Sequence, residues 1–76
     1  MDINKLVIQK IIKVAKEQNL TMKDLFNVTK RDRKYFDNVM SCKNNIDVFM
    51  FLKICKLFKI DAGDFLKEFD DMSEKI

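Results

Sequence analysis

The sequence predicts an all-α protein: a single compact domain of five helices. Three observations lead to this prediction. The chain of 76 residues contains one glycine and no proline, so it lacks the turn residues on which β-hairpins and sandwich corners depend. Its hydrophobic fraction of 47% is too high for a disordered chain. Apolar residues also recur at helical spacing, and a candidate N-cap residue precedes each apolar stretch.

The first helix is expected over residues 3–18, with Asp2 as its N-cap. Its apolar residues follow the helical period, but they cover an arc wider than the roughly 100° stripe of a single packed face. Ile8 and Ile12 lie at the edge of this arc, so they are candidates for contact with a second partner. Asn19 is expected to end the helix in the left-handed conformation.

Four further candidate caps predict four further helices. Thr21 opens the second helix, and Asp24 stands three residues on, as in a variant of the capping box. The third, fourth and fifth helices are expected to begin after Asp32, Asp47 and Asp61. The connections between these helices are short, which is typical of one helical domain.

Charge is distributed unevenly between the body of the chain and its end. Residues 61–76 hold six acidic and two basic residues, a net charge of −4, whereas residues 1–60 carry +7. We expect residues 1–69 to form the domain and residues 70–76 to form a frayed acidic tail. A basic body of this kind suggests an anionic partner, and nucleic acid is the leading candidate.

The residue types that are missing exclude several kinds of chemistry. The chain has no histidine, so a histidine-activated nucleophile and a histidine-containing zinc site are ruled out. Cys42 and Cys55 cannot supply four zinc ligands; we expect buried or half-buried thiols in a reducing compartment, with a disulfide as the alternative. We therefore expect no enzymatic activity, metal, cofactor or small-molecule ligand. The N-terminus has no signal-peptide layout and no apolar run approaches 18 residues, so a soluble, cytoplasmic protein is expected.

The second and third predicted helices lie close together, and both arginines of the chain fall where the third begins, in Lys30-Arg31-Asp32-Arg33-Lys34. Apolar residues and candidate helix caps occur on both sides of this pair of helices. They are Ile11, Val14, Leu20, Thr21, Leu25, Asp32, Phe36, Val39, Asp47, Val48, Phe51, Leu52, Phe58, Ile60, Asp61, Phe65 and Leu66. In these residues the chain resembles, without gaps over residues 11–66, the lambda-repressor-like (Cro-type, xenobiotic-response-element) helix-turn-helix family.

The chain departs from the family pattern around the turn. Phe26 stands where the family usually has a small alanine, and Lys30 and Arg31 replace the turn glycine and the apolar residue that follows it. The residues that stand where the family uses turn glycines are Asn19, Lys30, Cys42 and Lys59.

Two starting points for the third helix remain open. In one register Asp32 caps it. In the other, Val28 and Thr29 serve as the apolar residue and the cap, so the helix starts one turn earlier and includes Lys30 and Arg31.

The resemblance implies that the third helix reads DNA bases in the major groove. The residues on its groove-facing side are Arg33, Lys34, Tyr35 and Asn38. Arginine can bridge guanine O6 and N7, and asparagine can pair bidentately with adenine. Contacts to DNA phosphates are expected from Thr21, Lys23, Lys30, Arg31, Lys43 and Asn44.

Seven phenylalanines are more than so small a domain readily buries. A dimer surface is therefore expected from Ile8, Ile12, Phe49, Met50 and Phe69. A symmetric dimer places two recognition helices about 34 Å apart and predicts a palindromic site.

Together these features favour a sequence-specific regulator of transcription that binds double-stranded DNA. The expected type is a small repressor of phage or mobile-element origin that acts as a homodimer. The alternative is a protein-interaction module of the antitoxin or antirepressor type, which has the same fold but weak or no DNA reading.

Overall fold

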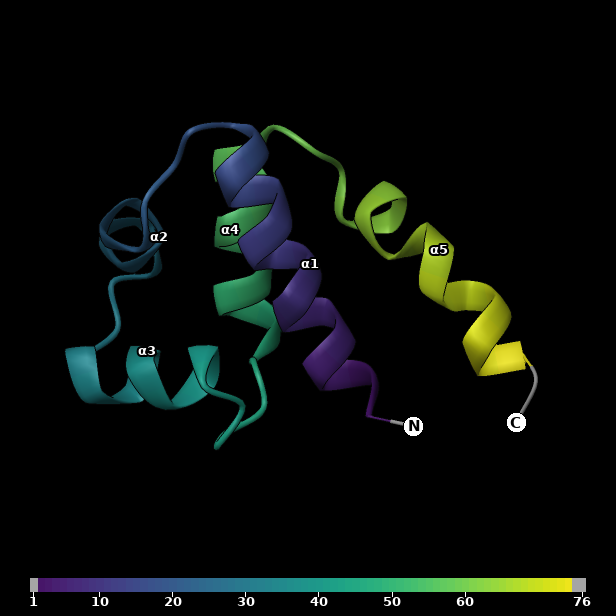
Figure 1. Ribbon diagram of the computed structural model, residues 1–76, viewed down its shortest axis with the longest axis horizontal. Helices are drawn as coiled ribbons and strands as arrows, with labels where there is room; N and C mark the ends of the chain where they lie inside the picture. Colours follow the sequence, from purple (N-terminus) through teal and green to yellow (C-terminus); the bar gives the residue numbers. More distant parts are fainter. Residues whose placement is uncertain (1, 75–76) are drawn as a thin grey trace.

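The computed structural model of the protein describes the backbone of residues 2–74 and the side chains of residues 2–69. Five helices follow one another: α1 (Ile3–Glu17), α2 (Met22–Thr29), α3 (Arg33–Met40), α4 (Val48–Phe58) and α5 (Ala62–Glu74) (Figure 1). No strand occurs within residues 2–74, so the predicted all-α fold is confirmed. In the same part of the chain, no helix is both long enough and apolar enough to cross a membrane.

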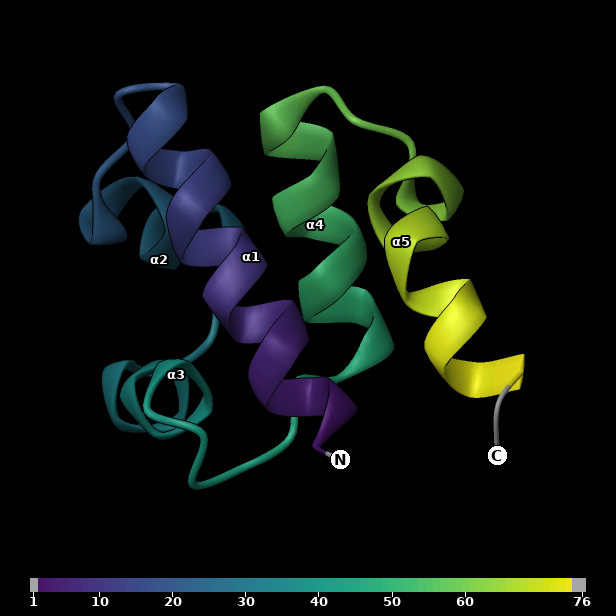
Figure 2. The same cartoon turned by 45° about the vertical axis from the view of Figure 1, so that its right-hand side comes forward.

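Helix α4 lies at the centre of the molecule and packs against α1, α2 and α5. Figures 1 and 2 show α5 on one side of α4, and α2 and α3 on the other. The central position follows from the composition of α4, because apolar residues occupy most of its circumference. Its buried residues are Met50, Phe51, Ile54, Cys55 and Phe58.

Each helix begins at the cap that the sequence predicts. A side-chain oxygen of the cap accepts the backbone N–H of the residue three positions on, which satisfies one of the free donors of the first turn. The donor–acceptor distances are 3.2 Å at Asp2, 3.2 Å at Thr21, 2.9 Å at Asp32, 2.8 Å at Asp47 and 3.3 Å at Asp61.

Four helices are followed by a residue in the left-handed conformation. These residues and their φ angles are Asn19 (59°), Lys30 (54°), Cys42 (66°) and Lys59 (61°). They are the four positions at which the family resemblance implies turn glycines. The backbone therefore adopts the conformation that glycine favours, although a side chain is present at each of these positions.

The third helix starts in the register capped by Asp32, and the alternative with Thr29 as the cap is wrong. Thr29 is the last residue of α2 and is 1% exposed. Its hydroxyl donates to the carbonyl of Phe26 at 2.9 Å. The left-handed turn at Lys30 then separates the two helices.

At the C-terminal end, the backbone is helical through Glu74, where the sequence predicts a frayed tail from residue 70 onward. The side chains of residues 70–76 lie outside the described part of the structure.

Three of the residues expected at a dimer surface lie in the core of the monomer instead. Ile8 is 1% exposed, Met50 is 0% exposed and Phe69 is 7% exposed. The wide apolar arc of α1 is covered within the chain, because α1 packs against α4 and is bonded to α5 through Lys10. Ile12 is half-buried and packs against the core.

Phe49 is the only one of the seven phenylalanines that is exposed. Five are buried, and Phe26 is half-buried. The domain thus buries most of its phenylalanines, and Phe49 is the one that it leaves exposed.

Candidate nucleic-acid interface

Helix α3 has a buried face and a charged, exposed face. Phe36 (3% exposed) and Val39 (0% exposed) anchor it in the core. Arg33 and Lys34 in its first turn are exposed, and Asn38 is half-buried. Tyr35 is also half-buried, so solvent reaches at least part of the side chain of all four predicted base-reading residues.

Arg33 lies over the contact between α2 and α3. Its guanidinium carbon is 5.2 Å from the centre of the Phe26 ring, and that ring meets Phe36 edge-on at 5.4 Å. Arg33 Nε also lies 3.4 Å from Asp37 Oδ1, one helical turn on. Both members of this ion pair are largely exposed, so the interaction is weak and leaves Arg33 able to exchange partners. Asp37 nevertheless reduces the positive potential of the exposed face.

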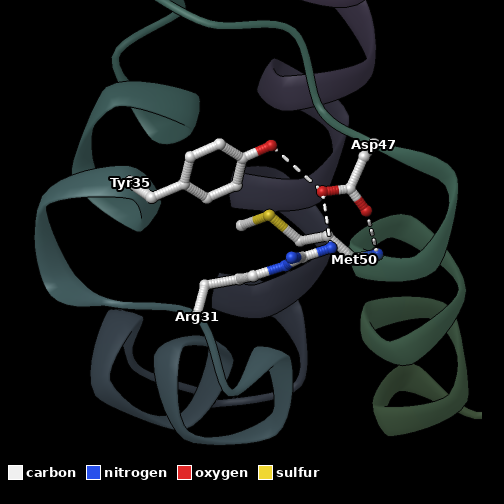
Figure 3. Close-up of polar contacts among 4 residues, drawn as sticks. All are labelled: Arg31, Tyr35, Asp47 and Met50. Carbon is white, nitrogen blue, oxygen red and sulfur yellow. Dashed lines mark hydrogen bonds and ion pairs between the residues drawn. The ribbon is translucent and has the colours of Figure 1, made fainter.

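Arg31 and Tyr35 meet at the carboxylate of Asp47, the N-cap of α4 (Figure 3). Arg31 Nη2 is 2.9 Å from Asp47 Oδ2, and the Tyr35 hydroxyl donates to the same oxygen at 3.0 Å. The backbone N–H of Met50 donates to Oδ1 at 2.8 Å. The guanidinium carbon of Arg31 also lies 5.5 Å from the centre of the Tyr35 ring. We call Arg31, Tyr35 and Asp47 the Asp47 cluster.

The bonds within the Asp47 cluster shift the pKa values of two of its members. The N–H of Met50, followed by the Tyr35 hydroxyl and Arg31, lowers the pKa of Asp47, although partial burial opposes this effect. The hydrogen bond to the Asp47 carboxylate, followed by burial, raises the pKa of Tyr35 above its usual value. The cluster therefore favours an ionised Asp47 and a protonated Tyr35.

Two residues that the sequence assigns to DNA belong to this cluster. Arg31, expected at a phosphate, is paired with Asp47, and the hydroxyl of Tyr35, expected at a base, is bonded to the same carboxylate. Together they join the segment before α3, the first turn of α3 and the start of α4. These contacts connect α3 to the start of α4.

Thr21, another expected phosphate contact, is occupied by its own capping box. Its N–H and its hydroxyl donate to Asp24 Oδ2 at 2.8 Å and 3.1 Å. The negative charge of Asp24 thus lies at the end of α2 where a phosphate was expected. Lys23 in the same turn is exposed.

The loop between α3 and α4 is held at both ends, while Lys43 and Asn44 are exposed. The backbone N–H groups of both residues donate to the carbonyl of Asn38, at 2.8 Å and 3.2 Å. Closer to α4, the N–H of Ile46 donates to the side-chain oxygen of Asn4 at 3.0 Å. The two polar side chains are therefore presented on a loop with a fixed backbone.

Lys30 lies apart from the residues of α3. It lines a hollow between α2 and α4 together with Val28, Lys53, Lys56 and Leu57. Lys53 and Lys56 are not among the residues that the sequence assigns to a partner. The signal that could have found them is their spacing of three on a predicted helix whose other faces are apolar.

No cluster of three or more potential metal ligands occurs within the described residues. Cys42 and Cys55 are both free thiols, half-buried and buried respectively. Burial raises the pKa of Cys55, and the nearby charge of Asp61 adds to this shift. The expected thiols are thus confirmed, and the alternative of a disulfide is wrong.

Comparison of the chain with protein-family models, with curated proteins and with solved structures found no match. The resemblance to the lambda-repressor-like family therefore rests on the residues quoted above.

Proposed function

We propose that the protein binds double-stranded DNA through α3 and regulates transcription, as a small repressor of the helix-turn-helix type. The observation that carries the proposal is the first turn of α3. Arg33 and Lys34 are exposed there, at the N-terminal end of a helix capped by Asp32. The opposite face of α3 is fixed in the core by Phe36 and Val39. A recognition helix needs both an anchored face and exposed donors at its N-terminal end.

The proposed division of roles follows from which side chains are engaged. Arg33, Lys34 and Asn38 read bases, since these residue types can donate to base edges in the major groove. The exposed side chains of Lys23, Lys43 and Asn44 contact phosphates. Arg31 and Tyr35 hold α3 in position through Asp47. A homodimer on a palindromic site remains part of the proposal, through an interface that does not use the buried Ile8, Met50 or Phe69.

In vitro selection from a random duplex library tests this proposal. We expect enrichment of specific duplexes at about 50 mM salt, with an affinity that falls with salt by a slope of about −0.9 per phosphate neutralised. The double variant Arg33→Ala/Lys34→Ala is expected to weaken binding by roughly 100-fold, because each lost base contact is worth about 1–3 kcal/mol. Lys13→Ala/Lys16→Ala, which removes two exposed lysines of α1, is the matched control. Absence of any enriched duplex at this salt concentration contradicts the proposal.

The second candidate is a protein-interaction module without DNA reading. Two carboxylates favour it, because Asp24 lies at the start of α2 and Asp37 lies on the exposed side of α3. Both are places that a duplex would approach in a helix-turn-helix complex. Reversal of charge at Arg33 and Lys34 separates the candidates: if biological activity survives Arg33→Glu/Lys34→Glu, the interaction module is favoured.

A further inference from the structure

The exposed side of α4 carries large apolar residues in its N-terminal half. Val48 is 67% exposed, Phe49 is 72% exposed and Leu52 is 45% exposed. The described residues have only one other exposed large hydrophobic side chain, Met22 on α2. Because Phe49 and Leu52 lie three residues apart, they share one side of the helix. An apolar cluster of this kind on the surface of a small protein is typical of a contact with another molecule.

The C-terminal half of the same side is basic. Lys53 and Lys56 follow Leu52 along the exposed surface, and Lys30 reaches the same hollow from the end of α2. None of these three lysines forms an ion pair within the described residues, where the pairs involve Lys10, Arg31 and Arg33 instead. Between Val48 and Phe58, helix α4 has two basic residues, Lys53 and Lys56, and no acidic residue; its caps are Asp47 and Lys59.

The hollow between these lysines has an apolar floor formed by Val28 and Leu57. Three ammonium groups around an apolar floor are complementary to a ligand that carries both carboxylates and apolar side chains. The surface formed by Val48, Phe49, Leu52, Lys53, Lys56 and Lys30 is referred to here as the α4 surface.

We propose that the α4 surface binds an acidic, amphipathic helical segment of a partner protein. Apolar residues of the partner, spaced at i, i+3, i+4 and i+7, cover Phe49 and Leu52, as in other helix-in-groove contacts. Carboxylates further along the partner helix pair with Lys53, Lys56 and Lys30. This proposal does not depend on the proposed DNA binding, since the α4 surface shares no residue with Arg33, Lys34 or Asn38.

Charge decides between this partner and the other possible occupants. A second copy that presents the same surface would add three more lysines to the interface and no carboxylate, because the six residues of the α4 surface include no acidic one. A DNA backbone could pair with Lys53 and Lys56, but it would leave Phe49 and Leu52 exposed to water. An acidic amphipathic helix satisfies both halves of the surface.

Selection from an mRNA-displayed library of random peptides, each about 16 residues long and able to form about four helical turns, tests the proposal on the full chain. We expect the enriched peptides to be acidic, with large apolar residues at helical spacing. Nuclear magnetic resonance is expected to show that they shift the amide signals of Phe49, Leu52, Lys53 and Lys56. Enriched peptides without an acidic bias, binding that maps elsewhere, or no enrichment would each overturn the proposal.

Variants of exposed residues separate the contributions of charge and apolar contact without disturbing the core. Lys53→Glu/Lys56→Glu is expected to weaken binding of the acidic peptides by roughly tenfold or more, and to select basic peptides in a repeated selection. Its matched control is Lys13→Glu/Lys16→Glu, with the same spacing and the same charge change on α1. Phe49→Ser is expected to weaken the same peptides, whereas Met22→Ser leaves them bound. Equal losses in a variant and its control would contradict the proposal.

Three further measurements test the other occupants. Lys53→Glu/Lys56→Glu is expected to bind duplex DNA as the matched control does. A loss of DNA binding equal to that of Arg33→Glu/Lys34→Glu would assign these lysines to DNA.

Sedimentation is expected to show the same oligomeric state for Phe49→Ser and the unmodified chain. Dissociation of a dimer in Phe49→Ser would assign the surface to a second copy. Vesicles containing phosphatidylserine are expected not to bind through Lys53 and Lys56; binding lost in their variant would assign the surface to a membrane. Any of these three assignments overturns the proposal.

Discussion

Lys10 and Arg31 each lie near an aromatic ring and pair with a carboxylate from a distant part of the chain, and the two contacts are built differently. The first, on α1, is Lys10. Its Nζ is 4.4 Å from the centre of the Phe65 ring and 2.7 Å from Glu68 Oε1, and it also donates to the carbonyl of Phe65. The side chain of Lys10 is 23% exposed, whereas that of Glu68 is 60% exposed. The cation is therefore the centre of this contact, which joins α5 to α1.

The second contact is the Asp47 cluster, in which the anion is the centre. Asp47 accepts hydrogen bonds from Arg31, from Tyr35 and from the backbone of α4, while Arg31 itself is more exposed than Asp47. When a charged group with several hydrogen-bond partners is removed, all of those partners lose a bond. Removal of a charged group with one partner affects that partner alone. Loss of a charge is therefore expected to cost most stability at Lys10 in the α1–α5 contact and at Asp47 beside α3.

The largest effect is expected from Asp47→Ala. This change removes the cap of α4, the ion pair with Arg31 and the acceptor of the Tyr35 hydroxyl, so we expect a loss of about 2 kcal/mol in the free energy of unfolding. Urea denaturation measures it. Asp61→Ala is the control, because Asp61 caps α5 through the backbone N–H groups of Gly63 and Asp64, and about 1 kcal/mol is expected there. Equal losses in the two variants would show that Arg31 and Tyr35 add nothing.

A smaller effect is expected from Lys10→Met, which keeps the aliphatic stem but removes the charge. The ion pair with Glu68, the bond to the Phe65 carbonyl and the interaction with the Phe65 ring are lost together, and we expect a loss of about 1 kcal/mol. Lys13→Met, at an exposed position one turn further along α1, is expected to change stability by less than about 0.5 kcal/mol. If both variants are equally stable, the cation is not the centre of the α1–α5 contact.

Glycine at the left-handed residues near each contact is expected to stabilise the protein slightly. Lys30 directly precedes Arg31, and Lys59 ends α4 before α5. In Lys30→Gly and Lys59→Gly, glycine removes the strain that a side chain causes in a left-handed backbone. This gain exceeds the cost of the entropy that glycine adds to the unfolded chain, so we expect each variant to gain about 0.5 kcal/mol of stability. Thermal denaturation checks the sign. Lys56→Gly, inside α4, is the control and is expected to lower stability by about 1 kcal/mol.

The smallest effect is the pH dependence that the Asp47 cluster contributes. Because the pKa of Asp47 is lowered in the folded protein, its contribution to stability is present above its ordinary pKa of about 4 and is lost as the pH falls through the lowered value. The effect is small because the carboxylate is partly exposed and solvent screens it. Denaturation between about pH 6 and pH 2 is expected to show a smaller acid loss in Asp47→Asn, which still accepts hydrogen bonds but has no proton to gain. An identical acid loss in both proteins would contradict this assignment.

The order and start of the helices could be predicted because the signals are local. A cap such as Asp32 acts on a backbone N–H only three residues away, and the left-handed ends, such as Asn19, follow from the adjacent helix. Local signals do not choose between Thr29 and Asp32 as the cap of α3, because both fit the same capping rules. The choice is decided by burial of Thr29 in the core, which depends on the packing of α2 rather than on neighbouring residues.

The parts that the sequence did not predict depend on contacts between distant segments. The sequence predicts Ile8 and Met50 at a dimer surface, but both are buried when their helices pack together. Arg31 reads as a phosphate contact until Asp47, sixteen positions on, is brought beside it. Lys53 has the appearance of an ordinary solvated lysine until α2 forms the other side of the hollow. Periodicity gives the direction of a side chain from its own helix, but not the element that meets it.

The contact between α1 and α5 also has a consequence for the order of folding. Lys10 and Phe65 are 55 positions apart, whereas Tyr35 and Asp47 are 12 apart. Closing the longer loop costs more chain entropy, and α5 is also the last of the five helices to be synthesised. Phe65 covers Phe51 edge-on at 5.4 Å and stacks on Phe58 at 6.4 Å. On a growing chain these two rings lack that cover until α5 is made, and apolar surface of this kind is what makes incompletely folded chains prone to aggregation.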